Sequence, residues 1–291
     1  MRILVPASSA NLGPGFDCFG VAWQLYNELE FIPGGGALAV SGCDEKYRND
    51  DNLAYRAYRA VMERFQLAPQ PLTINFLRCD IPISRGLGSS SALLVGGVMA
   101  ANAIHSLNMN RDELLSVATA LEGHPDNVAP ALFGGLTASA VEAGIPLSVR
   151  YPLSPKLHFT ALIPPFELST ALARKVLPRD VPRADAIFNV SRAALLLSAL
   201  GSGDISLLRA AMADRLHEPY RRALIEGYDT ARALAYKHGA EAMCISGAGS
   251  TLLCVAAHPS LAADIAADLD AHLHGWRAVT LLPELEGARI V

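Results

Sequence analysis

The amino-acid sequence predicts an α+β fold with two domains. Segments with strand-like alternation and segments with helical periodicity are mixed along the chain, without the regular strand–helix–strand order of a parallel sheet. The chain has 291 residues, 51% of them hydrophobic, which is enough for two buried cores. A strand-like stretch marked by prolines, Leu153–Pro165, follows the middle of the chain. We therefore place a boundary near residues 145–155 and expect domains at residues 1–150 and 151–291.

Local patterns predict the elements of the first half. Short apolar or alternating runs predict strands at Arg2–Val5, within residues 28–42 and at Leu72–Leu77. Apolar residues at helical spacing predict a helix over Asn52–Gln66, and the serines after a glycine-rich loop open a second helix that runs to about His105. Residues 110–113, Asn-Arg-Asp-Glu, are a capping-box variant and predict a third helix that ends at Gly123.

The second half mixes helices and strands in the same way. Helical periodicity predicts helices at about residues 184–200, 204–215, 220–238 and 260–274. Short apolar runs predict strands at residues 242–246, 251–256, 276–281 and 287–291. A glycine-rich turn separates the first two of these strands, as in a hairpin.

Composition narrows the class of function. The net charge is −4 and no basic stripe occurs, so we expect no nucleic-acid partner. There is no uninterrupted apolar run of about 20 residues and no signal peptide, so we expect no membrane association and a cytoplasmic location. The five cysteines are odd in number and lack CxxC spacing, which argues against disulfides and a zinc site. These features favour a protein that acts on small molecules.

Three glycine-rich turns, at residues 12–15, 86–88 and 247–249, carry the functional signal. The second turn, Gly86-Leu87-Gly88, stands directly before Ser89-Ser90-Ser91 and a run of small apolar residues. Glycines let a ligand approach the backbone, and free amides at a helix N-terminus attract anions. An ordinary capped helix would show the same stretch. The chain has neither the Gly-Lys-Ser/Thr of a Walker loop nor a dinucleotide-binding fingerprint.

Together, the three turns resemble the motifs of the GHMP kinase superfamily, the kinases of galactose, homoserine, mevalonate and phosphomevalonate. Residues 6–20, 82–92 and 246–250 resemble its N-terminal, central and C-terminal motifs, in the same order and spacing. The resemblance covers essentially the whole chain. It implies the GHMP kinase fold, with an N-terminal domain like domain 2 of ribosomal protein S5 and a ferredoxin-like C-terminal domain.

Four segments resemble the homoserine kinase branch of the superfamily: residues 6–17, 122–130, 169–178 and 218–221. This resemblance implies transfer of phosphate from ATP to the side-chain hydroxyl of L-homoserine, which gives O-phospho-L-homoserine in threonine biosynthesis. It also implies a homodimer. The alternatives are a kinase of another small alcohol, such as mevalonate or a sugar, a ligand sensor without catalysis on this fold, and a nucleic-acid-binding protein that uses the S5-like half.

For the nucleotide, the resemblance implies that Asn52 lies near the adenine and that a loop binds the phosphates: Pro82, Ile83, Ser84, Arg85, Gly86, Leu87, Gly88, Ser89, Ser90, Ser91 and Ala92. Backbone amides would there take the place of a P-loop lysine. Ser90 and Glu122 match the Mg²⁺ ligands of the family, and hydroxyl and carboxylate oxygens suit that ion. The sequence leaves open whether Ser89 or Ser90 provides the hydroxyl.

For the acceptor, the resemblance implies a clamp on a zwitterionic amino acid. Arg174 and Arg221 would bind the α-carboxylate, because the guanidinium fork matches a carboxylate, and Asp17 would accept from the ammonium group. Asn11 and the catalytic candidate His124 would help to fix the side-chain hydroxyl, and Thr170 would complete this end of the site. Taken one by one, these residues have plainer explanations: the arginines could be solvated, the histidine could be an ordinary loop residue, and the aspartate could be hydrogen-bonded to its own turn.

The general base is the one departure from the mevalonate-type pattern. Those relatives carry an aspartate seven residues before a Gly-Gly pair, whereas the same count from Gly134 reaches Asn127 here. An amide cannot take a proton at neutral pH. We therefore expect catalysis by positioning and charge neutralisation, since the loose transition state of phosphoryl transfer needs little early proton removal. Asp126 stays open as an alternative base.

Overall fold

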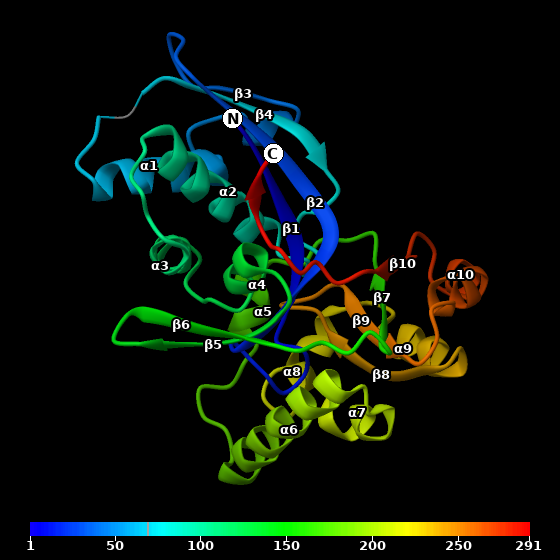
Figure 1. Cartoon of the computed structure of the whole chain (residues 1–291). Helices are drawn as coiled ribbons and strands as arrows, with labels where there is room; N and C mark the ends of the chain where they lie inside the picture. Colours follow the sequence, from blue (N-terminus) through cyan, green and yellow to red (C-terminus); the bar gives the residue numbers. More distant parts are fainter. Residues whose placement is uncertain (69) are drawn as a thin grey trace.

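The computed structural model describes residues 1–68 and 70–291, and it contains two sheets with helices packed against them (Figure 1). The first sheet has the order β11-β1-β2-β4-β3, and β5 pairs with both β2 and β6. The strands of this sheet are β1 (Arg2–Ala10), β2 (Phe19–Pro33), β3 (Ala39–Ser41), β4 (Leu72–Cys79), β5 (Leu136–Glu142), β6 (Ile145–Tyr151) and β11 (Arg289–Ile290). Because β11 pairs with β1, the chain ends beside its own beginning (Figure 1).

Helix α2 lies at the centre of the first half and positions the site, because the central glycine-rich turn leads directly into it. It packs against α1, α3 and β1. Gly97 makes the contact with α1 possible, since a Cβ atom there would lie 2.1 Å from the Ala54 carbonyl oxygen. The helices of this half are η1 (Glu45–Tyr47), α1 (Leu53–Arg64), α2 (Ser89–Ile104), α3 (Arg111–Glu122) and α4 (Val128–Phe133).

The second sheet is antiparallel, with the order β10-β7-β9-β8. Its strands are β7 (His158–Ile163), β8 (Ala240–Ile245), β9 (Leu252–Ala256) and β10 (Arg277–Leu281). With α9 (Tyr228–Lys237) and α10 (Leu261–His272), they run in the order β7-α9-β8-β9-α10-β10. This is the ferredoxin-like arrangement, so the α+β class and the ferredoxin-like unit are confirmed.

Between β7 and α9 the chain inserts α5 (Thr170–Lys175), α6 (Arg183–Ser202), α7 (Ile205–Ala211), α8 (Glu218–Arg221) and η2 (Arg222–Leu224). The prediction of one helix over residues 220–238 is wrong. Ile225 leaves the helical conformation with φ −107° and ψ 96°, and Gly227 has a φ of +82° before α9 begins. The hairpin of β5 and β6 was not expected either.

Helix α6 is long and apolar enough to cross a membrane, judged by length and composition alone. One such helix is weak evidence for a membrane span, and 22% of this apolar segment is buried. Leu196, Ala199 and Leu200 of α6 are buried in the hydrophobic core.

Candidate active site

The three glycine-rich turns meet in space although more than 200 residues separate the first from the last. Asn11 donates from Nδ2 to the carbonyl oxygen of Gly247 at 2.7 Å, and the Gly247 amide donates to the carbonyl oxygen of Ala10 at 3.0 Å. Ser246 donates from Oγ to the carbonyl oxygen of Gly86 at 2.6 Å. The structure therefore joins the three motifs into one hydrogen-bonded unit.

The central turn needs glycine for both conformation and space. Gly86 and Gly88 have φ angles of +74° and +71°, which disfavour residues with a side chain. A Cβ atom on Gly86 would lie 2.2 Å from the Ser246 carbonyl oxygen, and one on Gly88 would lie 2.1 Å from Ser8 Oγ. The loop therefore presents bare backbone at the N-terminus of the 16-residue helix α2, where amides and helix dipole favour an anion.

A cavity of about 550 Å³ opens above this loop. It collects most of the residues that the sequence singles out: Asn11, Asp17, Asn52, Ile83, Ser84, Arg85, Gly86, Gly88, Ser89, Ser90, Glu122, His124, Asp126, Asn127, Thr170, Arg174 and Arg221. Four of the expected loop residues do not line it, namely Pro82, Leu87, Ser91 and Ala92. Leu87 and Ala92 are buried in the hydrophobic core, and Ser91 is buried as well, so their side chains support the loop from behind.

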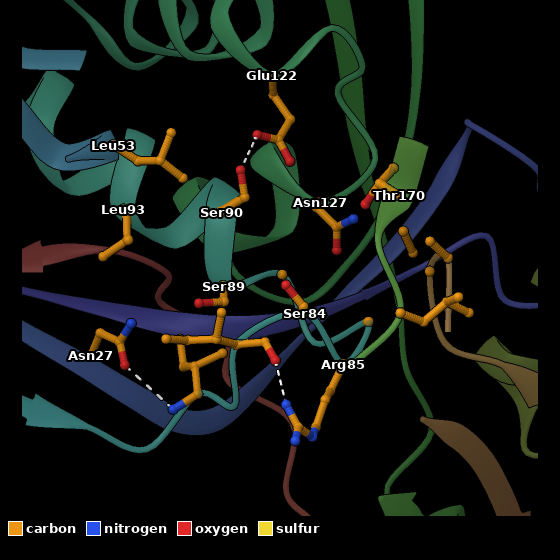
Figure 2. A pocket seen from close by; sticks show the side chains of 18 of the residues that line it. Asn27, Leu53, Ser84, Arg85, Ser89, Ser90, Leu93, Glu122, Asn127 and Thr170 are labelled. Carbon is orange, nitrogen blue, oxygen red and sulfur yellow. Dashed lines mark hydrogen bonds between the residues drawn. The ribbon is translucent and has the colours of Figure 1, made fainter. Parts of the chain in front are cut away.

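The Arg85 side chain stabilises the loop through hydrogen bonds to main-chain carbonyl oxygens. Its guanidinium donates to the carbonyl oxygens of Ile83, Pro164 and Pro165 at 2.7, 3.2 and 2.6 Å. Figure 2 shows its side chain leading away from Ser90. Arg85 therefore fastens the loop to the segment after β7, and the backbone amides are the groups of the loop that could bind an anion.

Asn52 uses both ends of its amide within the protein. Its Oδ1 accepts from the amides of Ala54 and Tyr55 and caps α1, while Nδ2 donates to the Tyr47 carbonyl oxygen at 3.0 Å. Lys46 and Tyr47, which the sequence did not predict as site residues, line the same end of the cavity. No local motif marks these two residues.

Apolar side chains form the wall of this end of the cavity. Leu53 of α1 and Leu93 of α2 face it (Figure 2), and Phe76 of β4 lines it too. An apolar slot with a few polar groups suits a flat aromatic base. None of these three residues was predicted, because each is an ordinary apolar residue in a regular element.

Two serines converge on Glu122 at the start of α2. Ser90 donates from Oγ to Glu122 Oε2 at 2.6 Å, as Figure 2 shows, and Ser91 donates to Oε1 at 3.0 Å. Ser89 makes no such contact among the described residues. Ser90 and Glu122 line the cavity together and offer hard oxygen donors beside the loop, so their chemistry fits Mg²⁺.

At the other end of the cavity, Asp17 and Arg174 form a bidentate ion pair at 2.8 and 3.0 Å. The side chains are 36% and 39% exposed, so a ligand in the cavity can reach both. Asn11 Oδ1 accepts from the Asp17 amide at 2.9 Å and holds the turn. Burial lowers the pKa of Arg174, but the hydrogen bond and charge of Asp17 outweigh it and raise the pKa overall.

His124, Asp126 and Asn127 lie beside this pair. His124 Nδ1 is hydrogen-bonded to Asp126 Oδ1. Burial lowers the pKa of His124, but the hydrogen bond and charge of Asp126 outweigh that effect and raise it. Ser8 Oγ donates to Asn127 Oδ1 at 2.9 Å, which fixes the amide. The Asp126 carboxylate is thus hydrogen-bonded to an imidazole whose pKa is raised.

Arg221 of α8 is only 2% exposed although it lines the cavity. Its Nε donates to the Ala173 carbonyl oxygen at 3.1 Å and its Nη1 to the Gly247 carbonyl oxygen at 3.2 Å. The Phe16 ring lies 5.1 Å from its guanidinium carbon. These contacts hold a buried positive charge at the end of the cavity that Asp17 and Arg174 line.

Glu218 begins the same short helix and makes folding sensitive to pH. Its Oε1 accepts from the Ile245 amide at 2.6 Å, and burial raises its pKa from 4.5 to about 8. Between about pH 4.5 and 8 the unfolded chain loses this proton while the folded chain keeps it, so stability falls as the pH rises through that window.

Glu218→Gln is therefore expected to reduce this pH dependence. Glutamine keeps an acceptor for Ile245 and carries no charge, so the free energy of unfolding at pH 8 should rise by about 2 kcal/mol relative to the parent. Urea unfolding at pH 5, 6.5 and 8 measures it, with exposed Glu226→Gln as the control. Parallel pH profiles for Glu218→Gln and the parent would contradict the assignment.

Comparisons with known proteins agree with this geometry. Residues 52–135 match the GHMP kinases N terminal domain, and residues 196–275 match the GHMP kinases C terminal domain. A homoserine kinase from Clostridium botulinum (strain Alaska E43 / Type E3) is 40% identical over 293 residues, which cover 100% of this chain and 98% of the relative. One from Clostridium kluyveri is 39% identical over 297 residues, with the same coverage.

Solved structures give the same result. A homoserine kinase from Cytophaga hutchinsonii superimposes with a TM-score of 0.89 at 26% identity, over 100% of this chain and 97% of that chain. A putative homoserine kinase from Listeria monocytogenes gives 0.80 at 34% identity, over 99% and 98%. The structure of "L. major mevalonate kinase in complex with R-mevalonate" gives a TM-score of 0.75 at 17% identity over 98% of this chain and 96% of that chain, which shows a shared fold.

The fold, the joined turns and these matches define a GHMP kinase, an enzyme that uses ATP as co-substrate. Within that superfamily, the chain belongs to the homoserine kinase family.

Proposed function

We propose that this kinase phosphorylates the side-chain hydroxyl of L-homoserine. The observation that carries the proposal is the exposed Asp17–Arg174 pair beside buried Arg221. The α-ammonium group of the acceptor would bind Asp17, and its α-carboxylate would bind Arg174 and Arg221. The zwitterion would thus replace one internal ion pair with two.

The nucleotide would lie along the cavity between the two ends described above. Its base would occupy the slot beside Leu53 and Phe76, and its phosphates would bind the amides of Gly86 to Ser90. Several charge-assisted hydrogen bonds, each contributing about 1.5–3 kcal/mol, can hold a triphosphate without a lysine. Mg²⁺, held by Ser90 and Glu122, would neutralise charge on the phosphates.

In the transfer, the homoserine oxygen would attack the γ-phosphorus while the bond to the departing ADP oxygen breaks. The amide of Asn127, oriented by Ser8, would hold the reacting groups in line. Asp126 and His124 would form an ion pair beside the hydroxyl and steady its position. Because the transition state is loose, the hydroxyl proton can leave late, to an oxygen of the transferred phosphoryl group, and no strong base is required.

The variant Asp126→Asn tests whether phosphoryl transfer proceeds without a general base. Asparagine keeps the shape of the side chain, so we expect kcat to fall by less than about 100-fold, below most of the range for a lost general base. Steady-state kinetics with ATP and L-homoserine measures the effect, with exposed Asp112→Asn as the control. A fall of more than about 10³-fold at unchanged KM would show that Asp126 is the base.

An alcohol panel tests the substrate. ADP release is measured with L-homoserine, L-serine, L-threonine, R-mevalonate and galactose under identical conditions, and L-homoserine should have the highest kcat/KM by about 100-fold or more. A larger value for mevalonate or the sugar would overturn the proposal. If no acceptor raises ADP release while homoserine still binds, the protein is a ligand sensor.

We propose a homodimer, on the resemblance to homoserine kinases, and a cytoplasmic location, where ATP is abundant. We also propose that the chain divides into an ATP-binding unit over residues 1–150 and a substrate-completing unit over residues 151–291, with β11 returning to the first sheet.

A further inference from the structure

His217 is a buried histidine that none of the family motifs in this sequence includes. It immediately precedes α8, the helix that carries Arg221, and its side chain is fully buried. Its ring stacks on Phe16, with centroids 5.1 Å apart and planes at 22°. Its main-chain amide donates to Asp214 Oδ2 at 2.9 Å. The Phe16 ring therefore packs on one face of the imidazole, and Asp214 fixes the main chain that carries it.

The neighbours of the ring determine where its proton lies. Nε2 is 2.8 Å from the carbonyl oxygen of Gly13 and 3.8 Å from an oxygen of Asp214. A carbonyl oxygen can only accept a hydrogen bond, so Nε2 carries the hydrogen. Nδ1 then has a lone pair, and Arg221 Nη1, which can only donate, lies 3.3 Å from it. If Nδ1 also carried a hydrogen, it would be a donor that faces the Nη1 donor of Arg221.

The ring also stays neutral. Burial lowers the pKa of His217, and the positive charge of Arg221 lowers it further, although Asp214 acts in the opposite direction. A neutral imidazole with hydrogen on Nε2 is the one form that satisfies Gly13 and Arg221 together.

His217 links the two halves of the proposed acceptor clamp. Gly13 and Phe16 belong to the turn that presents Asp17, whereas Arg221 comes from α8. Arg221 Nε and Nη1 have partners in Ala173, Gly247 and His217, and Nη2 has none among the described residues. The three contacts fix the guanidinium in place and leave Nη2 for the ligand in the cavity.

We propose that His217 is a positioning residue for acceptor binding: its Nδ1 accepts from Arg221 and its Nε2 donates to Gly13, so that both charged ends of the clamp keep their spacing. The inference rests on the proposed role of Arg221 in binding the homoserine carboxylate. It concerns KM for the acceptor, because His217 has hydrogen-bond partners in Gly13, Asp214 and Arg221 and none in residues 86–90 among the described residues.

Two substitutions separate the two nitrogen atoms. In His217→Gln the side-chain amide reaches the place of Nε2 and can donate to Gly13, but nothing accepts from Arg221. In His217→Asn the shorter amide reaches the place of Nδ1, and its oxygen can accept from Arg221. We expect His217→Gln to raise KM for L-homoserine about 10-fold or more with KM for ATP unchanged within about twofold, and His217→Asn to restore most of the affinity.

A merely structural role would affect both variants alike. The melting temperatures of the two variants are compared, with exposed His274→Gln as the control. Equal KM values for homoserine in the two variants, or an equal rise in KM for both substrates, would overturn the inference. Arg221→Gln tests the role of Arg221 separately from that of His217. If Arg221→Gln raises KM for homoserine and His217→Gln does not, only the role of His217 fails. If Arg221→Gln leaves KM for homoserine unchanged, the role of Arg221 fails as well.

The parent enzyme provides a readout that needs no variant. Long-range ¹H–¹⁵N spectra of histidine-labelled protein should show a neutral His217 ring with hydrogen on Nε2, and L-homoserine should shift its Nδ1 resonance. Hydrogen on Nδ1, or a doubly protonated ring at pH 7, would overturn the inference even if both variants fail to fold.

Discussion

Glu122→Gln is expected to lower kcat by about 100-fold or more and to raise the Mg²⁺ concentration needed for half-maximal activity. Glutamine keeps the size of the side chain and an oxygen that can accept from Ser90 or Ser91, so the fold should persist. It removes the negative charge that would hold the cation near the phosphates, and metal ions supply several kcal/mol of charge stabilisation in such transfers. Steady-state rates across a Mg²⁺ titration measure the effect.

The two serines beside this carboxylate make a matched pair. Ser90→Ala removes the hydroxyl that bonds Glu122, whereas Ser89→Ala removes one that does not, so only the former should change the Mg²⁺ dependence. Glu63→Gln, on the exposed face of α1, controls for a change in net charge. Unchanged turnover and Mg²⁺ dependence in Glu122→Gln would remove the proposed metal site.

The parts of the site that the sequence reveals are those where backbone geometry restricts the residue type. Gly86 and Gly88 have positive φ angles and neighbours closer than 3 Å to any added Cβ atom. Because only glycine fits these positions, the local sequence is sufficient to predict the turn. Ser90 and Glu122 follow from the family motif. Their mutual hydrogen bond, between residues 32 positions apart, could not be read from either segment alone.

The parts that were missed depend on contacts between distant segments. His217 touches Gly13 across 204 positions, and a histidine before a Glu-Pro pair gives no local sign of burial. The break after η2 was missed for a related reason. The Ile225 side chain packs in the hydrophobic cluster between the second sheet and its helices α9 and α10, and this tertiary packing outweighs the helical periodicity of residues 220–238.

Gly88→Ala is expected to have the other large effect, on both stability and ATP binding. Alanine at a φ of +71° costs about 1–2 kcal/mol, and its Cβ atom would lie 2.1 Å from Ser8 Oγ. With the overpacking included, we expect a loss of about 2–4 kcal/mol in the free energy of unfolding. Displacing Ser8 also frees Asn127 and shifts the loop amides, so KM for ATP should rise about 10-fold or more.

Gly144→Ala is the matched control, because Gly144 has a φ of +81° but nothing within 4 Å of an added Cβ atom. It should show the conformational cost alone, with KM for ATP unchanged. Adding Ser8→Ala to Gly88→Ala removes the clashing oxygen, so the double variant should regain part of the stability lost by Gly88→Ala. If Gly88→Ala and Gly144→Ala lose the same stability and bind ATP equally well, the close approach of Ser8 does not explain the need for glycine. If the double variant regains stability while its KM for ATP stays high, the two effects are separate. Ser8 then limits the space at the turn, and the amides of the turn bind the phosphates.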